Sequence, residues 1–208
     1  MGLNFNYLLY FPKEKIWEVL KSLSEGCDTE GMKPTTIQFP DHDLALPLTT
    51  SWGESAVVPY NQSKYEFAIS MVFEEDPAIL EYLTNRGDDL EERSPPEDST
   101  PNRYAIGFIY LTVYADLDKH YGFTQPNEMV LFEFGTTGTR MSLLFSESTS
   151  IKETFIKLLE NHHGICGIFD WENDYGELLW FKGEEMSFRL SSNYLLPDQI
   201  ETELSRGW

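Results

Sequence analysis

The sequence predicts an α+β fold: a mostly antiparallel sheet of about seven to nine strands, with two main helices packed on one face. Apolar residues alternate with period two over 3–11, 65–73 and 104–115, which is typical of strands. They recur at helical spacing over 13–25 and 151–160. Because strand patterns resume on both sides of each interruption, we expect residues 1–208 to form a single globular domain.

The chain opens with a strand followed by a helix. The strand pattern runs from Leu3 to Phe11, and Pro12 ends it. From Lys13 the apolar residues fall on one helical face, and Gly26 supplies a stop. That face comprises Ile16, Trp17, Val19, Leu20 and Leu23.

The next part alternates between broken and regular patterns. Four prolines divide residues 29–63, so we expect one or two short or edge strands within ordered loops. A strand over 65–73 follows. Asp76 is then placed to cap a short helix with Pro77 at its first position.

Residues 104–115 form the most informative strand pattern. Both of its faces are apolar, which predicts a strand in the middle of the sheet. We therefore expect Phe108 and Leu111, one on each face, to lie in the core.

Two hairpins are predicted further along. The first joins 129–134 to 140–145 through Gly135–Thr139, and the second joins 166–171 to 177–181. The glycine-rich connection resembles a phosphate-binding loop, but a turn between strands lacks the helix N-terminus that such a loop needs.

The second main helix is expected to begin with Ser150 as its cap and Glu153 at the capping-box position, and a short helix from Pro197 ends the chain. Lys13–Cys27 aligns without gaps on Lys152–Cys166 with four identities, and each segment is expected to follow a strand. A duplication and a chance match of two amphipathic helices both account for this.

Residues 86–102 interrupt the regular pattern. They combine six acidic residues with three prolines and almost no apolar residue apart from Leu90. Such a segment buries too little surface to offset its ordering entropy, so we expect a mobile acidic, proline-rich loop.

The charge balance is strongly acidic. Fifteen Lys and Arg face 35 Asp and Glu, which gives a net charge of −20. Phosphate backbones and anionic lipids repel such a surface, so we expect neither nucleic-acid nor membrane partners. Two interpretations remain: attraction to a basic protein partner, or solubility alone. Candidate binding acids are Asp88, Asp89, Glu91 and Glu92.

The cellular setting is expected to be the cytoplasm. The first residues lack the basic and apolar regions of an export signal, and no apolar run reaches the length of a membrane span. Cys27 and Cys166 are therefore expected to be reduced thiols.

Motifs for metal or catalytic chemistry are weak. His162, His163, Cys166 and Asp170 offer zinc-ligand types, but adjacent helical histidines point about 100° apart. The run Asp41-His42-Asp43 indicates a polar turn. We therefore expect no metal, no cofactor and no catalytic residue of identified role.

An aromatic face is the remaining candidate. Tyr104, Phe108, Tyr110 and Tyr114 alternate along one predicted strand, with Tyr65, Phe67 and Phe73 on another. They are able either to line a ligand cavity or to form core. The leading hypothesis is a non-catalytic acidic protein that regulates or neutralises a basic partner. The alternatives are a small-molecule binder that uses this face and an enzyme with a dispersed His/Asp site.

Overall fold

A seven-stranded antiparallel sheet forms the centre of the protein, as seen in a computed structural model that describes residues 2–29, 33–48, 55–94, 102–121, 128–172, 175–192 and 195–206. The strand order is β10-β9-β8-β1-β7-β6-β5. The strands are β1 (Asn6–Pro12), β5 (Lys64–Glu74), β6 (Arg103–Tyr114), β7 (Met129–Gly135), β8 (Cys166–Asp170), β9 (Gly176–Phe181) and β10 (Glu184–Leu190).

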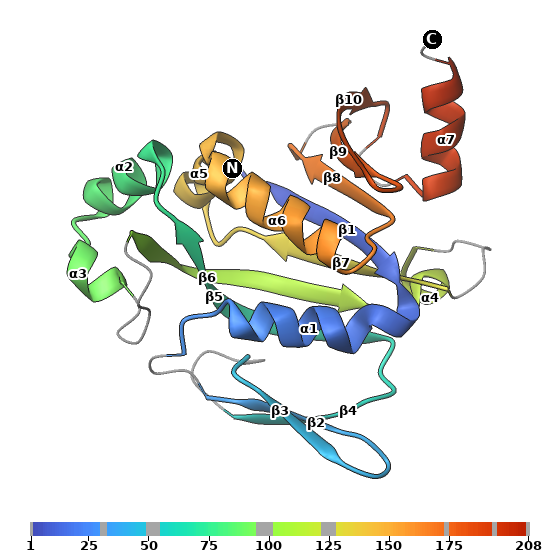
Figure 1. The fold of residues 1–208 in the computed structure, drawn as a ribbon, viewed down its shortest axis with the longest axis horizontal. Coiled ribbons are helices and arrows are strands. Elements are labelled where there is room, and N and C mark those ends of the chain that lie inside the picture. Colours follow the sequence, from blue (N-terminus) through green and yellow to red (C-terminus); the bar gives the residue numbers. More distant parts are fainter. Residues whose placement is uncertain are drawn as a thin grey trace.

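Two helices cover one face of this sheet (Figure 1). α1 (Ile16–Glu25) follows the short 3-10 turn η1 (Lys13–Lys15), and α6 (Thr149–Asn161) lies beside it on the same face. Their apolar sides join the sheet in the main core, where Leu9, Leu20 and Phe155 are buried. The predicted fold class is therefore confirmed.

A separate small sheet lies beyond α1. Its strands are β2 (Thr35–Gln38), β3 (Asp43–Leu46) and β4 (Ala56–Pro59), with β2 in the centre. Ile37, Leu46 and Leu48 belong to the main core cluster, so this sheet is attached through shared apolar contacts. The sequence predicted only one or two short strands here.

The remaining helices lie around the sheet. They are α2 (Pro77–Arg86), α3 (Leu90–Arg93), α4 (Leu117–Tyr121), α5 (Thr139–Glu147) and α7 (Pro197–Arg206). α7 belongs to a second apolar cluster, in which Ile200 is fully buried with Leu8 and Ile168. Among the described residues, none of the helices is both long and apolar enough to cross a membrane.

The predicted first hairpin is wrong in its second half. Residues 140–145 belong to α5, so Gly135–Thr139 connects a strand to a helix instead of turning between strands. Met141, Leu144 and Phe145 are buried at i, i+3 and i+4, which fits one helical face as well as the short run fitted a strand. The second hairpin, β8–β9, is confirmed.

The predicted cap of α6 is also wrong. Ser148 caps this helix: its hydroxyl accepts a hydrogen bond from Ile151 N at 3.1 Å. Asp76 caps α2 as predicted, with Oδ1 accepting from Ile79 N at 2.8 Å. Its second oxygen accepts from the Ser148 hydroxyl at 2.6 Å and from Ser150 N at 3.0 Å. One carboxylate therefore ties the N-termini of two helices together.

The two segments considered for duplication occupy different settings. α1 follows strand β1, but α6 follows helix α5. After α1 the chain enters the main sheet at the edge strand β5, whereas after α6 it enters β8, directly beside β1. The assumption that each segment follows a strand is wrong, and the strand placement does not repeat.

Part of the segment expected to be a loop is helical. Residues 90–93 form α3, whose Leu90 packs against the main core. Residues 95–101 lie outside the described part of the chain. The predicted mobility of 86–102 stays a prediction.

Candidate functional site

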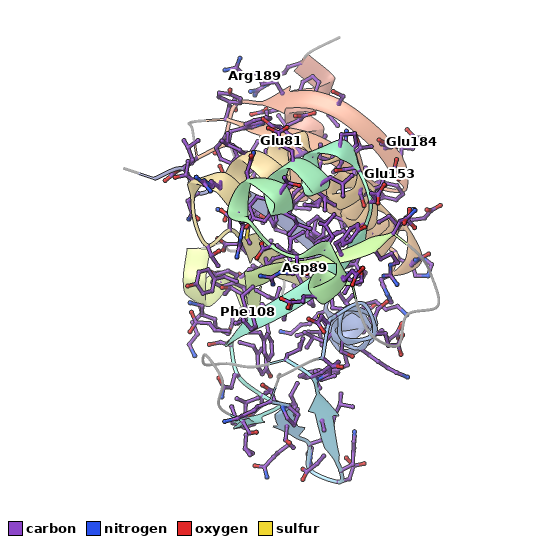
Figure 2. All side chains as sticks on the ribbon, turned by 90° about the vertical axis from the view of Figure 1, so that its left-hand side faces the viewer. Glu81, Asp89, Phe108, Glu153, Glu184 and Arg189 are labelled. Carbon is purple, nitrogen blue, oxygen red and sulfur yellow. The ribbon has the colours of Figure 1, made fainter. Side chains whose placement is uncertain are left out.

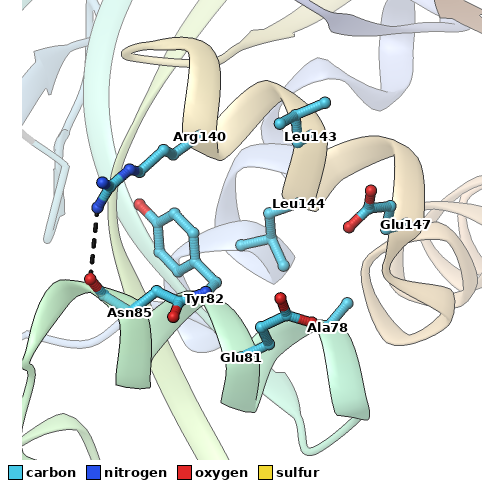
Figure 3. A pocket seen from close by; sticks show the side chains of 8 residues that line it. All are labelled: Ala78, Glu81, Tyr82, Asn85, Arg140, Leu143, Leu144 and Glu147. Atoms are coloured by element: carbon cyan, nitrogen blue, oxygen red, sulfur yellow. Dashed lines mark hydrogen bonds between the residues drawn. The ribbon is translucent and has the colours of Figure 1, made fainter.

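A groove runs between α2 and α5 at one end of the molecule (Figure 3). Its volume is about 270 Å³, and its apolar surface comes from Ala78, Leu143 and Leu144. Leu143 is 42% exposed and lies beside Leu144 and Ala78 in the groove lining. The apolar surface is therefore accessible to a ligand.

Charged side chains border this groove. Glu81 of α2 and Glu147 of α5 lie toward one end, and Arg140 lies at the other (Figure 3). Arg140 Nη1 donates to the backbone oxygen of Asn85 at 3.4 Å, which links the two helices. Both glutamates are exposed, so their charges face solvent.

A second, smaller cavity adjoins the first. Its volume is about 160 Å³, and Glu147 lines both cavities. Glu177 of β9 and Lys152 of α6 line the second one, together with the aromatic rings of Phe145, Phe169 and Trp171. Glu81, Glu147 and Glu177 thus follow one path over α2, α5 and β9. We call these two cavities and the three glutamates the acidic track.

The buried side chain of Tyr7 and the hydrogen bonds of Asp76 hold the walls of the acidic track in position. The Tyr7 hydroxyl donates to the Phe145 backbone oxygen at 3.0 Å, and its ring lies 4.8 Å from that of Phe169. Burial, with a smaller effect of the Glu177 charge, raises the pKa of Tyr7 far above its ordinary value, so the hydroxyl stays protonated. The part of the second cavity formed by Tyr7 therefore carries no charge.

The bond network of Asp76 holds α2 against the junction of α5 and α6. Burial alone would raise the pKa of this carboxyl, but hydrogen bonds from Ser148, Ile79 and Ser150 outweigh it and lower the pKa below its ordinary value. Asp76 is therefore ionised at neutral pH and keeps the groove walls in place.

The predicted acidic binding residues do not share one role. Asp88 is paired with two arginines: Arg93 Nη2 donates to Oδ1 at 2.7 Å, and Arg86 Nε lies 2.9 Å from Oδ2 without hydrogen-bond alignment. Asp89 caps α3 by accepting from Glu91 N at 2.9 Å. The carboxylate of Asp88 therefore has a structural role, because it forms ion pairs with Arg86 and Arg93.

Three of the four predicted acids still present charge to solvent. Asp89, Glu91 and Glu92 are exposed. Figure 2 shows Asp89 and Glu81 on the same end of the molecule, both toward the viewer. Asp89 of the predicted patch thus lies on the same end of the molecule as Glu81 of the acidic track.

The predicted aromatic face is divided between two sides of the sheet. Gly107 has φ of 101°, and the pairing of β5 with β6 shifts register opposite it. Tyr104 therefore belongs to the helix-covered core, with Tyr65, Phe67 and Phe73. Beyond Gly107, Ile109, Leu111 and Val113 take over that core face, and the other face carries Phe108, Tyr110 and Tyr114.

The second sheet face is partly polar. Phe108 is half-buried and Tyr110 is 46% exposed, so the expectation that Phe108 is core is wrong. Phe108 lies away from the helix-covered side (Figure 2). Glu133 shares this face: burial raises its pKa, a hydrogen bond from Tyr114 opposes the rise, and the charge of Asp170 adds to it.

The candidate catalytic and metal residues lie in separate places. His42 Nδ1 lies 2.9 Å from Asp41 Oδ1, and its ring stacks on Phe39 in the connection between β2 and β3. His162 lies at the end of α6, where burial lowers its pKa and Glu18 of α1 opposes this. Within the described ranges, no three His, Cys, Asp or Glu side chains form a group able to hold a metal ion.

The track residues Arg140, Leu143 and Glu147 were missed in the sequence because 140–145 was assigned to a strand. The helical alternative was visible in the spacing of Met141, Leu144 and Phe145. No sequence signal places Glu177 beside Glu147, since 30 positions separate them. Comparison with known protein families, curated proteins and solved structures found no match.

Proposed function

We propose that this chain is a non-catalytic interaction protein that binds an extended basic segment of a protein partner along the acidic track. One observation carries the proposal: Glu147 lines two adjoining cavities, so carboxylates from α2, α5 and β9 follow one path with apolar surface beside them. Extended charged surfaces of this kind favour encounter with an oppositely charged partner.

The groove suits the side chain of a lysine or arginine. Its aliphatic stem can lie on Leu143 and Leu144 while its cationic head meets Glu81 and Glu147. The aromatic second cavity suits an apolar residue of the same segment. Alternating basic and apolar residues are therefore the expected pattern in the partner.

The overall charge and the free cysteines support binding to a basic protein in a reducing compartment. A net charge of −20 repels nucleic acid and anionic lipid and attracts basic proteins. Cys27 and Cys166 are free thiols, as expected in a reducing compartment such as the cytoplasm.

Binding of a synthetic peptide in which Lys alternates with Leu tests the proposal. Fluorescence anisotropy measures its affinity at low and at physiological salt, with a peptide carrying Gln in place of Lys as control. The double variant Glu81→Gln/Glu147→Gln should weaken binding about tenfold at low salt, because two rim charges are lost. Leu143→Ser should weaken it further by removing the exposed apolar contact.

The matched control is Glu25→Gln/Glu160→Gln, which changes the net charge equally at exposed positions of α1 and α6. Its binding should differ from that of the unmodified protein less than twofold. If both double variants weaken binding equally, the charge acts only through the whole molecule, and the acidic track is not the binding site.

A further inference from the structure

A cavity of about 450 Å³ lies at the N-terminal end of α1, between the first residues of that helix, the loop 60–63 and the residues that follow β6. It shares no residue with the acidic track. Three aromatic side chains line it: Trp17, Tyr60 and Tyr65. The volume falls in the range of pockets for small ligands, roughly 300–1,000 Å³.

The aromatic walls form one continuous cluster. The ring of Trp17 lies 5.8 Å from that of Tyr65 and 4.8 Å from that of Phe39. Phe39 in turn stacks on Tyr60 at 5.5 Å. Tyr60 is 41% exposed, so one ring of the cluster is accessible for stacking by a planar ligand.

Hydrogen bonds fix the cavity in advance of binding. The Tyr65 hydroxyl donates to the Tyr60 backbone oxygen and accepts from Gln62 N at 3.2 Å. The loop 60–63 is also held to the end of β6, because Ser63 O accepts from Ala115 N at 2.9 Å. A preformed wall lowers the ordering cost of binding.

Lysines outnumber carboxylates among the described residues that line this cavity, although the whole chain is strongly acidic. Lys13 and Lys119 line the cavity, and Asp116 is its one carboxylate among the described lining residues, which leaves a surplus of one positive charge. Asp116 Oδ1 accepts from Lys119 N at 3.2 Å and is thereby engaged at the start of α4. Lys15, Lys64 and Lys182 each form an ion pair with a glutamate. Among the described residues, no carboxylate forms an ion pair with Lys13 or Lys119.

We infer that this cavity binds a small planar aromatic anion. The ring stacks against Tyr60 and Trp17, and the anionic group meets the ammonium groups of Lys13 and Lys119. The anion is either a carboxylate, as in an aromatic acid, or a phosphate, as in a mononucleotide. This inference is independent of the proposed partner site.

Isothermal titration calorimetry on the full chain tests it, with indole-3-acetate and adenosine monophosphate as the two probes. Indole and adenosine lack the anion, and acetate and inorganic phosphate lack the ring. At least one probe should bind with a Kd between about 10 μM and 1 mM, and its ring-only and anion-only controls at least tenfold more weakly. The probe that binds identifies the anion class.

Variants locate the binding. Lys119→Gln and Tyr60→Ala should each weaken it about fivefold or more, since both side chains are accessible and their loss leaves the core intact. Lys157→Gln, an equal charge change on the exposed side of α6, should leave affinity within twofold. Glu147→Gln should also leave it unchanged, which separates this site from the acidic track.

Three results would overturn the inference: neither probe binds, phosphate or acetate alone binds as tightly as its ring-bearing counterpart, or Lys157→Gln weakens binding as much as Lys119→Gln. Circular dichroism of each variant confirms that its fold is retained.

Discussion

At the scale of single residues, Asp76 has the most consequential position for the proposed partner site. It accepts hydrogen bonds from the start of α2 and from the start of α6, so it sets how α2 lies against the neighbouring helices. The groove wall formed by Ala78 and Glu81 begins within one turn of it. Stability and binding geometry therefore depend on the same carboxylate.

Asp76→Ala should lower the free energy of unfolding by about 2 kcal/mol at pH 7, because two helix N-termini lose their acceptor. The folded-state pKa is lowered, so the contribution of the ionised carboxyl is present above the unfolded pKa of about 4 and is lost as pH falls toward the folded pKa. Urea denaturation at pH 7 and at about pH 3 measures both effects.

Asp118→Ala, at an exposed position of α4, is the control and should change stability by less than about 0.5 kcal/mol. A difference between Asp76→Ala and the unmodified protein that stays constant across this pH range would show that the charge of Asp76 is not what stabilises the tie.

At the scale of elements, β6 has one buried and one partly open side. Leu111 is fully buried in the helix-covered core, whereas Phe108 is half-buried on the other face. The sequence showed apolar residues on both sides and predicted burial of both. Only the sheet position and the register shift at Gly107 separate the two residues.

Leu111→Asp should abolish soluble expression, because an unpaired carboxylate in the core costs several kcal/mol or more. Phe108→Asp should still fold, with a loss of roughly 1–2 kcal/mol from the contacts that its half-buried ring makes. Expression yield and thermal melting of the two variants give the comparison. Equal failure of both would mean that the face of Phe108 is closed.

The α2–α3 corner depends on one ion-paired carboxylate. Asp88→Ala should cost about 2 kcal/mol, because the pairing with Arg86 and Arg93 is lost at a position only 16% exposed. Asp89→Asn should stay within about 0.5 kcal/mol, since asparagine caps a helix as well as aspartate does. Chemical denaturation of both variants tests the assignment, and equal stabilities would show that Asp88 acts as another surface acid.

At the scale of the whole molecule, the charge imbalance affects stability as well as partner choice. A net charge of −20 places many carboxylates close enough to repel one another in the compact state. Pairs such as Lys15–Glu18 and Lys64–Glu66 offset only part of it. The fold is thus stabilised by burial against an electrostatic cost.

Raising sodium chloride from about 10 to 150 mM should therefore raise the melting temperature by a few degrees, because the Debye length falls to about 8 Å and repulsion is screened. Differential scanning calorimetry measures the shift. The variant Glu81→Gln/Glu147→Gln should show a smaller rise. A melting temperature that falls with salt would mean that attractive pairs dominate the folded-state electrostatics.

The sequence by itself determined the α+β class, the strands β1, β5 and β6, the two covering helices and the cap at Asp76. These features depend on local periodicity and on residues a few positions apart. It also determined the acidic character, which requires only composition.

Only the tertiary structure decided the rest. Whether 140–145 forms a strand or a helix depended on packing against α2 and the sheet, because that short run fits both periods. Gly107 moved Tyr104 to the opposite face from Phe108, and Asp88 became part of an ion pair. Glu147 and Glu177 line one cavity although they are 30 residues apart, because strand order and helix packing, which no local pattern encodes, bring β9 beside the end of α5.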